Sequence, residues 1–168
     1  MARLDLSHES PSDVAVTMRS LPRRFGEALA ARDDDEDVEA LARVMGPDGS
    51  SALDHVADTG RMLALIRRAL VDVVSGHQPV LHAAITDPSA RTWEHAATDL
   101  EGELSLLTDE ATALAEQVER TSAEQWNAVG TIASGTEMTA LDLAREAVQV
   151  AIAGLKATEA AMAAARQA

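Results

Sequence analysis

Polar side chains in the stretch 54–58 have the residue types and the spacing of a cation site. Asp54 and Asp58 stand four residues apart, so on a helix their carboxylates share one face, and His55 lies three residues before Asp58. Glu146, much later in the chain, would add a third carboxylate. Oxygen ligands of this kind suit a hard divalent ion, so one interpretation of these residues is a carboxylate metal site.

The same residues also have a purely structural interpretation. They would be polar flanks of two helices, with Arg61 and Arg145 as their salt-bridge partners, since Arg61 lies only three residues after Asp58. The other histidines have no companion donors at ligand spacing, and we expect all of them at the surface: His8, His77, His82 and His95. The sequence contains neither a G-x-S-x-G nucleophile motif nor a phosphate-binding glycine loop.

Composition restricts both the chemistry and the fold. The 168 residues include no cysteine, which excludes disulfides, thiolate catalysis and thiolate metal sites. Hydrophobic residues make up 46% of the chain, but only Phe25, Trp93 and Trp126 are aromatic, so the core must consist mainly of aliphatic side chains. Runs with the period-two pattern of strands are missing, and we expect an all-α fold without a sheet.

The charge and hydropathy of the chain exclude several classes of partner. A formal net charge of −14 would repel nucleic acid, and we expect no nucleic-acid partner. No segment reaches the roughly 18 consecutive apolar residues of a membrane-spanning helix, and the first residues lack the apolar core of a signal peptide. We therefore expect no membrane association and a cytoplasmic location.

Four long helices and one short helix are expected to position the polar residues. The clearest spans residues 139–165, where Thr139 and Asp142 form a capping box and the apolar seam is Leu141, Ala144, Val148, Ala151, Leu155 and Met162. Another follows the break at residues 46–49, begins after Ser50 or Ser51 and ends near Val74.

The remaining helices are expected earlier in the chain and between these two. The first would run from 13 toward 31 after a Ser12 cap, with a break near Ser20 caused by Pro22. A short helix is expected at 38–45. A third long helix would be capped by Asp87 or Ser89, with Trp93 and Ala97 opening its seam. We expect a flexible lead-in at 1–11 and one domain at 12–168, a four-helix bundle with long inter-helix connections.

Three stretches of sequence occur in an order and at spacings that match a known family. They are LPRRFGEALA, GPDGSSALDHVADTGRMLALI and TSAEQWNAVGTIASGTEMTALDLAREAVQVAIAGLKATE. They resemble the first helix, the second helix and the closing stretch of the DinB-like superfamily, which includes the N-terminal domain of mycothiol-dependent maleylpyruvate isomerases. The resemblance implies a four-helix bundle with a zinc or nickel site between helices, where the metal activates a low-mass thiol such as mycothiol, bacillithiol or glutathione.

The ligand positions implied by this resemblance do not carry the family's histidines. The second-helix ligand position is Asp58, and the H-x-x-x-H positions of the last helix are Gln149 and Ala153. Ser50 stands at a position that is usually Trp, and Gly154 at one that is often His. A carboxylate, an amide and a methyl group do not replace three imidazoles around a borderline metal ion, and we expect no metal at this position.

The sequence leaves two classes of function open. The leading hypothesis is a DinB-like bundle without the metal triad and without a cofactor, acting as a non-catalytic small-molecule-binding or protein-interaction domain. It would use the inter-helix pocket near Asp58, Gln149 and Ala153, with further polar groups from Asp54, His55, Arg61, Arg145 and Glu146. The alternative is a mycothiol-dependent transferase or isomerase that uses Asp58 as a base or a divalent metal at a replacement site. The Ala-rich end at 157–168 makes a homodimer plausible and leaves the oligomeric state open.

Overall fold

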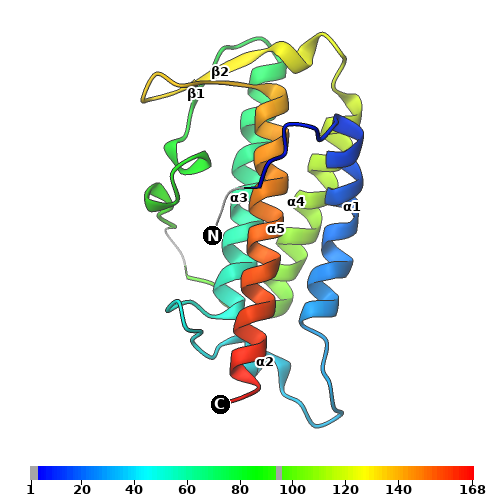
Figure 1. Cartoon of the computed structure of the whole chain (residues 1–168), viewed down its shortest axis with the longest axis vertical. Helices are drawn as coiled ribbons and strands as arrows, with labels where there is room; N and C mark the ends of the chain where they lie inside the picture. The colour runs from blue at the N-terminus through cyan, green and yellow to red at the C-terminus, as the bar shows by residue number, and fades with distance from the viewer. Residues whose placement is uncertain (1–3, 94–95) are drawn as a thin grey trace.

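Four long helices form the body of the molecule (Figure 1). The computed structural model describes residues 4–93 and 96–168. The bundle consists of α1 (Pro11–Ala28), α3 (Ala52–Val74), α4 (Leu100–Arg120) and α5 (Ala140–Ala165), with the short α2 (Val38–Ala42) at one end. The expected all-α four-helix bundle with an additional short helix is therefore confirmed.

The order of the helices around the bundle requires one long crossover. α1 and α3 each pack against both α4 and α5. α1 and α5 run in one direction, whereas α3 and α4 run in the other (Figure 1). Since α3 and α4 are consecutive and parallel, the chain between them must return along the full length of the bundle. We call this connection, residues 75–93 and 96–99, the crossover; it contains the one-turn helices η1 (Ala83–Ile85) and η2 (Pro88–Ala90).

A small three-stranded sheet closes one end of the bundle, and our expectation of no sheet is wrong in this respect. The strands are β1 (Val80–Leu81), β2 (Val129–Ile132) and β3 (Glu137–Thr139). They lie in the order β1-β2-β3, with β2 parallel to β1 and antiparallel to β3. The glycine-containing stretch after α4 forms a hairpin, in whose turn Gly135 adopts a φ of +89°.

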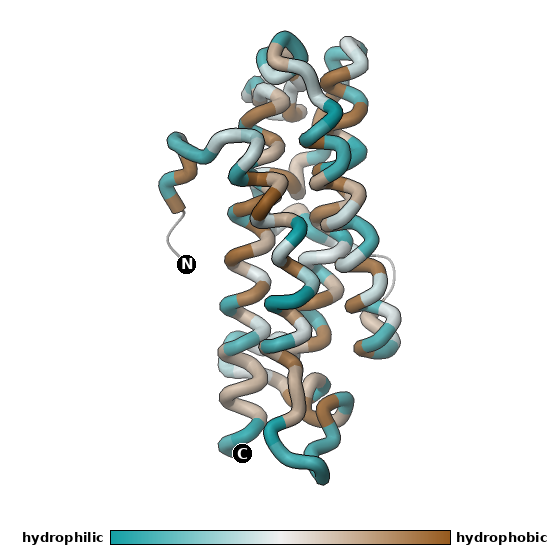
Figure 2. The backbone as a smooth tube through the Cα atoms, turned by 90° about the vertical axis from the view of Figure 1, so that its right-hand side faces the viewer, coloured by the Kyte–Doolittle hydropathy of each residue, from teal (hydrophilic) through white to brown (hydrophobic). Residues whose placement is uncertain are grey.

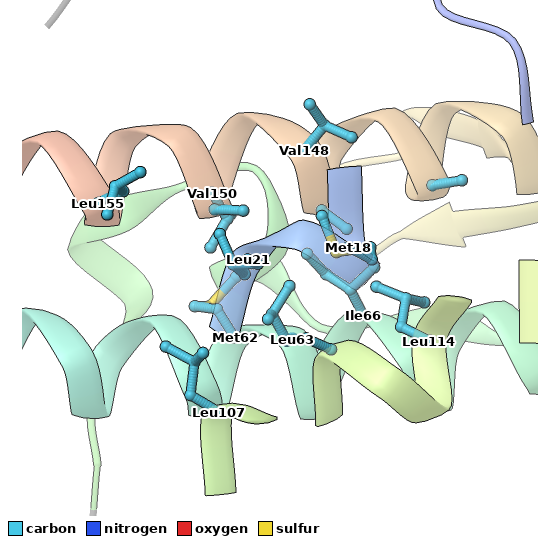
Figure 3. Close-up of a cluster of buried hydrophobic side chains, with 14 of the residues drawn as sticks. Met18, Leu21, Met62, Leu63, Ile66, Leu107, Leu114, Val148, Val150 and Leu155 are labelled. Atoms are coloured by element: carbon cyan, nitrogen blue, oxygen red, sulfur yellow. The ribbon is translucent and has the colours of Figure 1, made fainter. Parts of the chain in front are cut away.

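The core lies between the four long helices and is aliphatic apart from Phe25. Figure 3 shows side chains of all four helices meeting there, among them Met18, Ile66, Leu114 and Leu155. Hydrophobic and hydrophilic positions alternate along each helix at helical spacing (Figure 2), as expected from the seams. The residues of α3 that recur at spacings of three and four are all buried: Ala52, Val56, Thr59, Leu63, Ile66, Leu70 and Val73. Among the described residues, no helix has the length and hydrophobicity needed to cross a membrane.

The caps of α3 and α5 are those indicated by the sequence, but α1 differs. Ser51 caps α3, and Thr139 forms the expected capping box with Asp142. α1 is capped by Ser10 instead of Ser12 and continues through Pro22 without a break near Ser20. Proline removes one helical hydrogen bond, but Leu21 and Phe25 on either side are fully buried, and this packing holds the helix together.

The helix before the closing stretch begins about ten residues later than expected. Asp99, and not Asp87 or Ser89, caps α4, with its Oδ1 accepting the Gly102 N–H at 2.6 Å. Asp87 instead caps the one-turn helix η2. Trp93 and Ala97 therefore lie in the crossover, outside the helix in which their spacing had placed them.

The Ala-rich end of α5 is partly used within the chain. Ala161, Met162 and Ala165 are buried, and α5 contacts α2. Just beyond α5, Arg166 forms an ion pair with Glu36 at 2.8 Å. This face of α5 therefore has a partner in its own chain. The homodimer stays a prediction.

Candidate functional site

A cavity of about 640 Å³ lies between α3, α5 and the crossover. Its volume is in the range of pockets that take small organic molecules. The three positions that the resemblance aligns with metal ligands, Asp58 on α3 and Gln149 and Ala153 on α5, all line it. His55 and Glu146 also belong to its wall. The sequence thus brings these candidate residues to one cavity, although they come from segments about 90 residues apart.

The carboxylate of Asp58 is held by two residues of the crossover. Nη1 of Arg91 lies 3.1 Å from Oδ2, and the indole Nε1 of Trp93 donates to Oδ1 at 2.8 Å. The side chains of Asp58 and Arg91 are 34% and 21% exposed. We call Asp58, Arg91 and Trp93 the Asp58 cluster. Arg91 was not among the predicted site residues, and Trp93 was predicted to lie in a helix seam.

The Asp58 cluster separates the main cavity from a neighbouring hollow of about 590 Å³. Asp58, Arg91, Pro88 and His55 line both spaces, whereas Trp93 lines only the second. The Asp58–Arg91 ion pair therefore lies at the boundary between the two spaces.

Arg61 and Arg145 were expected to form salt bridges with the candidate carboxylates, but they have other partners. Arg61 lies on the α4 side of α3 and forms an ion pair with the buried Glu103 at 3.1 Å. Arg145 donates from Nη2 to the carbonyl of Ser7 at 2.6 Å and from Nε to the carbonyl of Glu9 at 3.0 Å. Both arginines thus hold structural elements together: Arg61 joins α3 to α4, and Arg145 fixes the segment before α1 to α5.

The carboxylate of Asp54 belongs to the capping box at the start of α3. Its Oδ2 accepts hydrogen bonds from the Ser51 N–H at 2.9 Å and the Ser51 hydroxyl at 2.7 Å. Burial raises the pKa of Asp54, but the two hydrogen bonds from Ser51 outweigh this effect, and the net pKa is lowered. Asp54 lines only the smaller hollow. Its role in the capping box separates it from Asp58, although both lie on one helix.

His55 stands at the boundary of both spaces and is paired with a loop carboxylate. Its Nε2 lies 3.3 Å from Oδ2 of Asp48, and its side chain is 17% exposed. The remaining described histidines, His8, His77 and His82, are exposed as expected, and His95 lies outside the described residues. His82 accepts the Ala84 N–H through Nδ1 and so caps η1.

Gln149 links the cavity to the segment that precedes α1. Its Oε1 accepts the Leu4 N–H at 2.8 Å. Glu146, one helical turn earlier, is buried and already has an interaction partner. Ala153, one turn later, contributes a methyl group to the wall. The α5 side of the cavity therefore passes from polar to apolar along the helix.

Gly154 brings α5 into close contact with α3 beside the cavity. A Cβ at this position would lie 1.9 Å from Oγ1 of Thr59, which itself donates to the His55 carbonyl at 2.7 Å. No larger side chain fits, and an imidazole at this position is excluded in this packing. Gly154 thus sets the distance between the two helices.

The residues at the aligned ligand positions do not fit a zinc or nickel ion. Both oxygens of Asp58 accept hydrogen bonds from the crossover, the Gln149 carbonyl oxygen accepts one from Leu4, and Ala153 has no donor atom. Across residues 4–93 and 96–168, no group of three or more histidine, aspartate or glutamate side chains is arranged to hold a metal. A borderline divalent ion prefers imidazole or thiolate ligands, and Asp58, Gln149 and Ala153 provide neither.

Comparisons with known proteins identify the fold. No family model matches the sequence, and no curated protein matches it. A solved structure does: YfiT from Bacillus subtilis, described as a probable metal-dependent hydrolase with an unusual four-helix bundle topology. The two share 12% sequence identity with a TM-score of 0.64, over 99% of this chain and 90% of that one. At this identity the likeness concerns the fold alone, a four-helix bundle; the resemblance to the DinB-like superfamily and to maleylpyruvate isomerases stays a prediction.

Proposed function

We propose that this protein is a non-catalytic small-molecule-binding member of the DinB-like fold, with the cavity between α3, α5 and the crossover as its binding site. The observation that carries the proposal is the Asp58 cluster. At the position where the family would place a metal ligand, a carboxylate instead accepts hydrogen bonds from Arg91 and Trp93. In this arrangement each oxygen that a metal would need as a ligand accepts a hydrogen bond from the crossover. The same hydrogen bonds hold the crossover in place as one wall of the cavity.

The shape and lining of the cavity support binding of a small organic molecule. Its wall combines apolar groups, such as Ile85 and Val150, with polar groups at defined positions, such as Gln149 and Arg91. Apolar surface supplies affinity and a few polar groups fix orientation, which is the usual composition of ligand pockets. One side of the cavity is formed by Gly154 and Thr59, where α5 and α3 are in close contact.

The thiol-dependent enzyme has less support from the arrangement of Asp58. Each Asp58 oxygen already accepts a hydrogen bond from a crossover side chain, so a substrate would have to approach the second lone pair of an oxygen whose orientation is set by Arg91 and Trp93. A replacement metal site would need Asp54, which is engaged in the α3 cap. The metal-dependent form of the enzyme hypothesis therefore requires a rearrangement of Asp54.

Metal content and turnover test this proposal together. Protein purified without chelator is analysed by mass spectrometry, before and after incubation with zinc, nickel, manganese and magnesium. We expect substoichiometric metal in all samples and no consumption of mycothiol or glutathione in the presence of electrophilic substrates. Stoichiometric metal that is lost on Asp58→Ala, together with thiol-dependent turnover, would establish the enzyme instead.

Ligand binding is tested by a variant that fills the cavity. Ala153→Phe places a ring in the space while leaving the Asp58 cluster intact, and Lys156→Gln changes an exposed residue of the same helix as a control. In a fragment screen by saturation-transfer NMR, binders of the native protein should be lost in Ala153→Phe and retained in Lys156→Gln. A screen in which no fragment distinguishes these two variants contradicts the proposed binding site.

A further inference from the structure

We propose that the cavity is selective for a neutral ligand that carries a hydrogen-bond acceptor, such as a carboxamide or a ketone, on a compact apolar body. This inference rests on the proposed function and specifies the chemical class of ligand. It follows from three properties of the lining residues: the charged side chains already have interaction partners, two residues retain unused N–H donors, and the rest of the wall is apolar except for Thr59 and Thr86.

The charged side chains of the cavity wall already have partners. Arg91 is paired with Asp58 at 3.1 Å, and Asp48 lies 3.3 Å from His55. Glu146 is likewise engaged. A charged ligand would lose its hydration on entering the cavity and would meet only charged side chains that already have partners. A neutral ligand avoids both costs.

Unused donors remain on opposite sides of the space. The guanidinium of Arg91 has five N–H groups, of which Nη1 contacts Asp58 and Nε makes a long contact of 3.5 Å with the Ala84 carbonyl. Its Nη2 has no acceptor in the described part of the chain. The side-chain amide of Gln149 uses its oxygen for Leu4, and within the described residues its NH₂ group donates to no protein atom.

These donors are accessible to a ligand. No buried side-chain nitrogen or oxygen among the described residues lacks a hydrogen-bond partner, so the unused N–H groups must face the cavity or solvent. Arg91 comes from the crossover and Gln149 from α5, and both line the cavity. A carbonyl oxygen of the ligand would satisfy one or both, because a carbonyl oxygen accepts two hydrogen bonds.

The remaining wall requires an apolar body on the ligand. Ile85 and Pro88 of the crossover contribute to the cavity from one side, and Val150, Ala153 and Ala157 contribute from α5. The residues of α5 around Gly154 are small, so this side offers a shallow surface without protruding side chains. An aromatic or compact aliphatic group can cover it and bury apolar area.

Three probes of nearly equal size and different charge test the ligand class: benzamide, benzoate and benzylamine. Their dissociation constants are measured at neutral pH by NMR titration of the full chain. We expect benzamide to bind most tightly. Gln149→Glu retains the acceptor for the Leu4 N–H but removes both N–H donors, and should weaken benzamide binding about fivefold. Lys156→Gln should leave it unchanged.

Each result separates the ligand class from the proposed function. If benzoate or benzylamine binds more tightly than benzamide and Ala153→Phe abolishes that binding, the neutral ligand class is wrong while the binding site stands. If Gln149→Glu leaves benzamide binding unchanged while circular dichroism shows an intact fold, the assignment of its amide as a donor is wrong. If none of the three probes binds at millimolar concentration, both the class and the proposed function are overturned.

Discussion

The indole Nε1 of Trp93 donates a hydrogen bond of 2.8 Å to Oδ1 of Asp58, 35 residues earlier in the chain. This contact fastens the crossover to α3 at the position where the DinB-like resemblance would place a metal ligand. Together with the Arg91 ion pair at Oδ2, it makes Asp58 a structural anchor. At this position the resemblance implies a metal-binding histidine, whereas here a carboxylate holds a segment of its own chain.

Replacing Trp93 by Phe should loosen the crossover. A phenyl ring replaces the indole, so an aromatic group is kept but the N–H donor to Asp58 is lost. We expect a decrease of about 1 kcal/mol in the free energy of unfolding. Urea denaturation followed by circular dichroism measures this change. Trp126→Phe, which leaves the Asp58 cluster intact, serves as the matched control and retains Trp93 as the only tryptophan. In that background, Asp58→Ala should shift Trp93 emission to longer wavelength; unchanged emission would contradict the anchoring role.

Gly154→Ala should destabilise the bundle strongly. The added Cβ would lie 1.9 Å from the Thr59 hydroxyl, so the α3–α5 contact must open, at a cost of about 2 kcal/mol. Thermal and urea unfolding measure the loss. The second change Thr59→Ala removes the clashing atom and should recover part of the stability, which a double-mutant cycle reveals.

Gly26→Ala provides the opposite control for the same substitution. Nothing lies within 4 Å of a Cβ at this exposed position near the end of α1. Alanine reduces the conformational freedom of the unfolded chain, so we expect a gain of about 0.5 kcal/mol. Equal effects of the two substitutions would mean that the close approach at Gly154 is incorrect.

Acid should destabilise the protein through its helix caps. Hydrogen bonds from the Ser10 hydroxyl and N–H lower the pKa of Asp13, and the Gly102 N–H and the Thr98 hydroxyl lower that of Asp99. The pKa of Asp54 is lowered by Ser51 against the effect of burial. A carboxyl whose folded pKa lies below its ordinary value of 3.8 stabilises the fold above that value, and this contribution is lost as the pH falls through the folded pKa.

The contribution of these groups to the free energy of unfolding should therefore be fully present and nearly independent of pH above about pH 5, and it should decrease below pH 4. Urea midpoints between pH 3 and pH 7 measure this dependence. Asp13→Asn, which keeps a capping oxygen but does not titrate, should flatten the acid limb. A profile that is unchanged by this substitution would exclude the α1 cap as a contributor.

Restoring three imidazoles should create a metal site if the positional alignment is right. Asp58→His, Gln149→His and Ala153→His place three imidazoles in one cavity, and removal of the Asp58 carboxylate also releases Arg91 and Trp93. We expect stoichiometric zinc or nickel, measured by mass spectrometry, and a higher melting temperature that chelator reverses. The double variant that retains Ala153 should bind more weakly. A folded triple variant without metal would show that these positions do not correspond to the family's ligands.

Helix positions and caps could be predicted from local sequence because they depend on neighbours within one turn. Ser51 and Thr139 have an aspartate three residues later, and the capping boxes formed as indicated. Pro22 misled the prediction of α1, because the buried residues around it act through tertiary packing. The hairpin of β2 and β3 was not predicted, because its strands are too short to show a period-two pattern.

The site itself could be predicted only in part. The resemblance placed Asp58, Gln149 and Ala153 near one another, and they line one cavity. Arg91 and Trp93 were not predicted as partners of Asp58, because the spacing of Trp93, Ala97 and Leu100 continues a helical seam although the helix starts only after Asp99. Contacts between residues more than 30 positions apart leave no trace in local periodicity.

The crossover that walls the cavity is also the covalent path between two parallel helices. The crossover is the loop that must close when α3 and α4 dock. A molecule that contacts both the crossover and α5 therefore reduces the effective length of this loop. Occupancy of the cavity and cooperativity of the whole bundle are coupled through this single stretch of chain. A ligand at the site would report itself as a change in global unfolding, even though it touches only one side of the molecule.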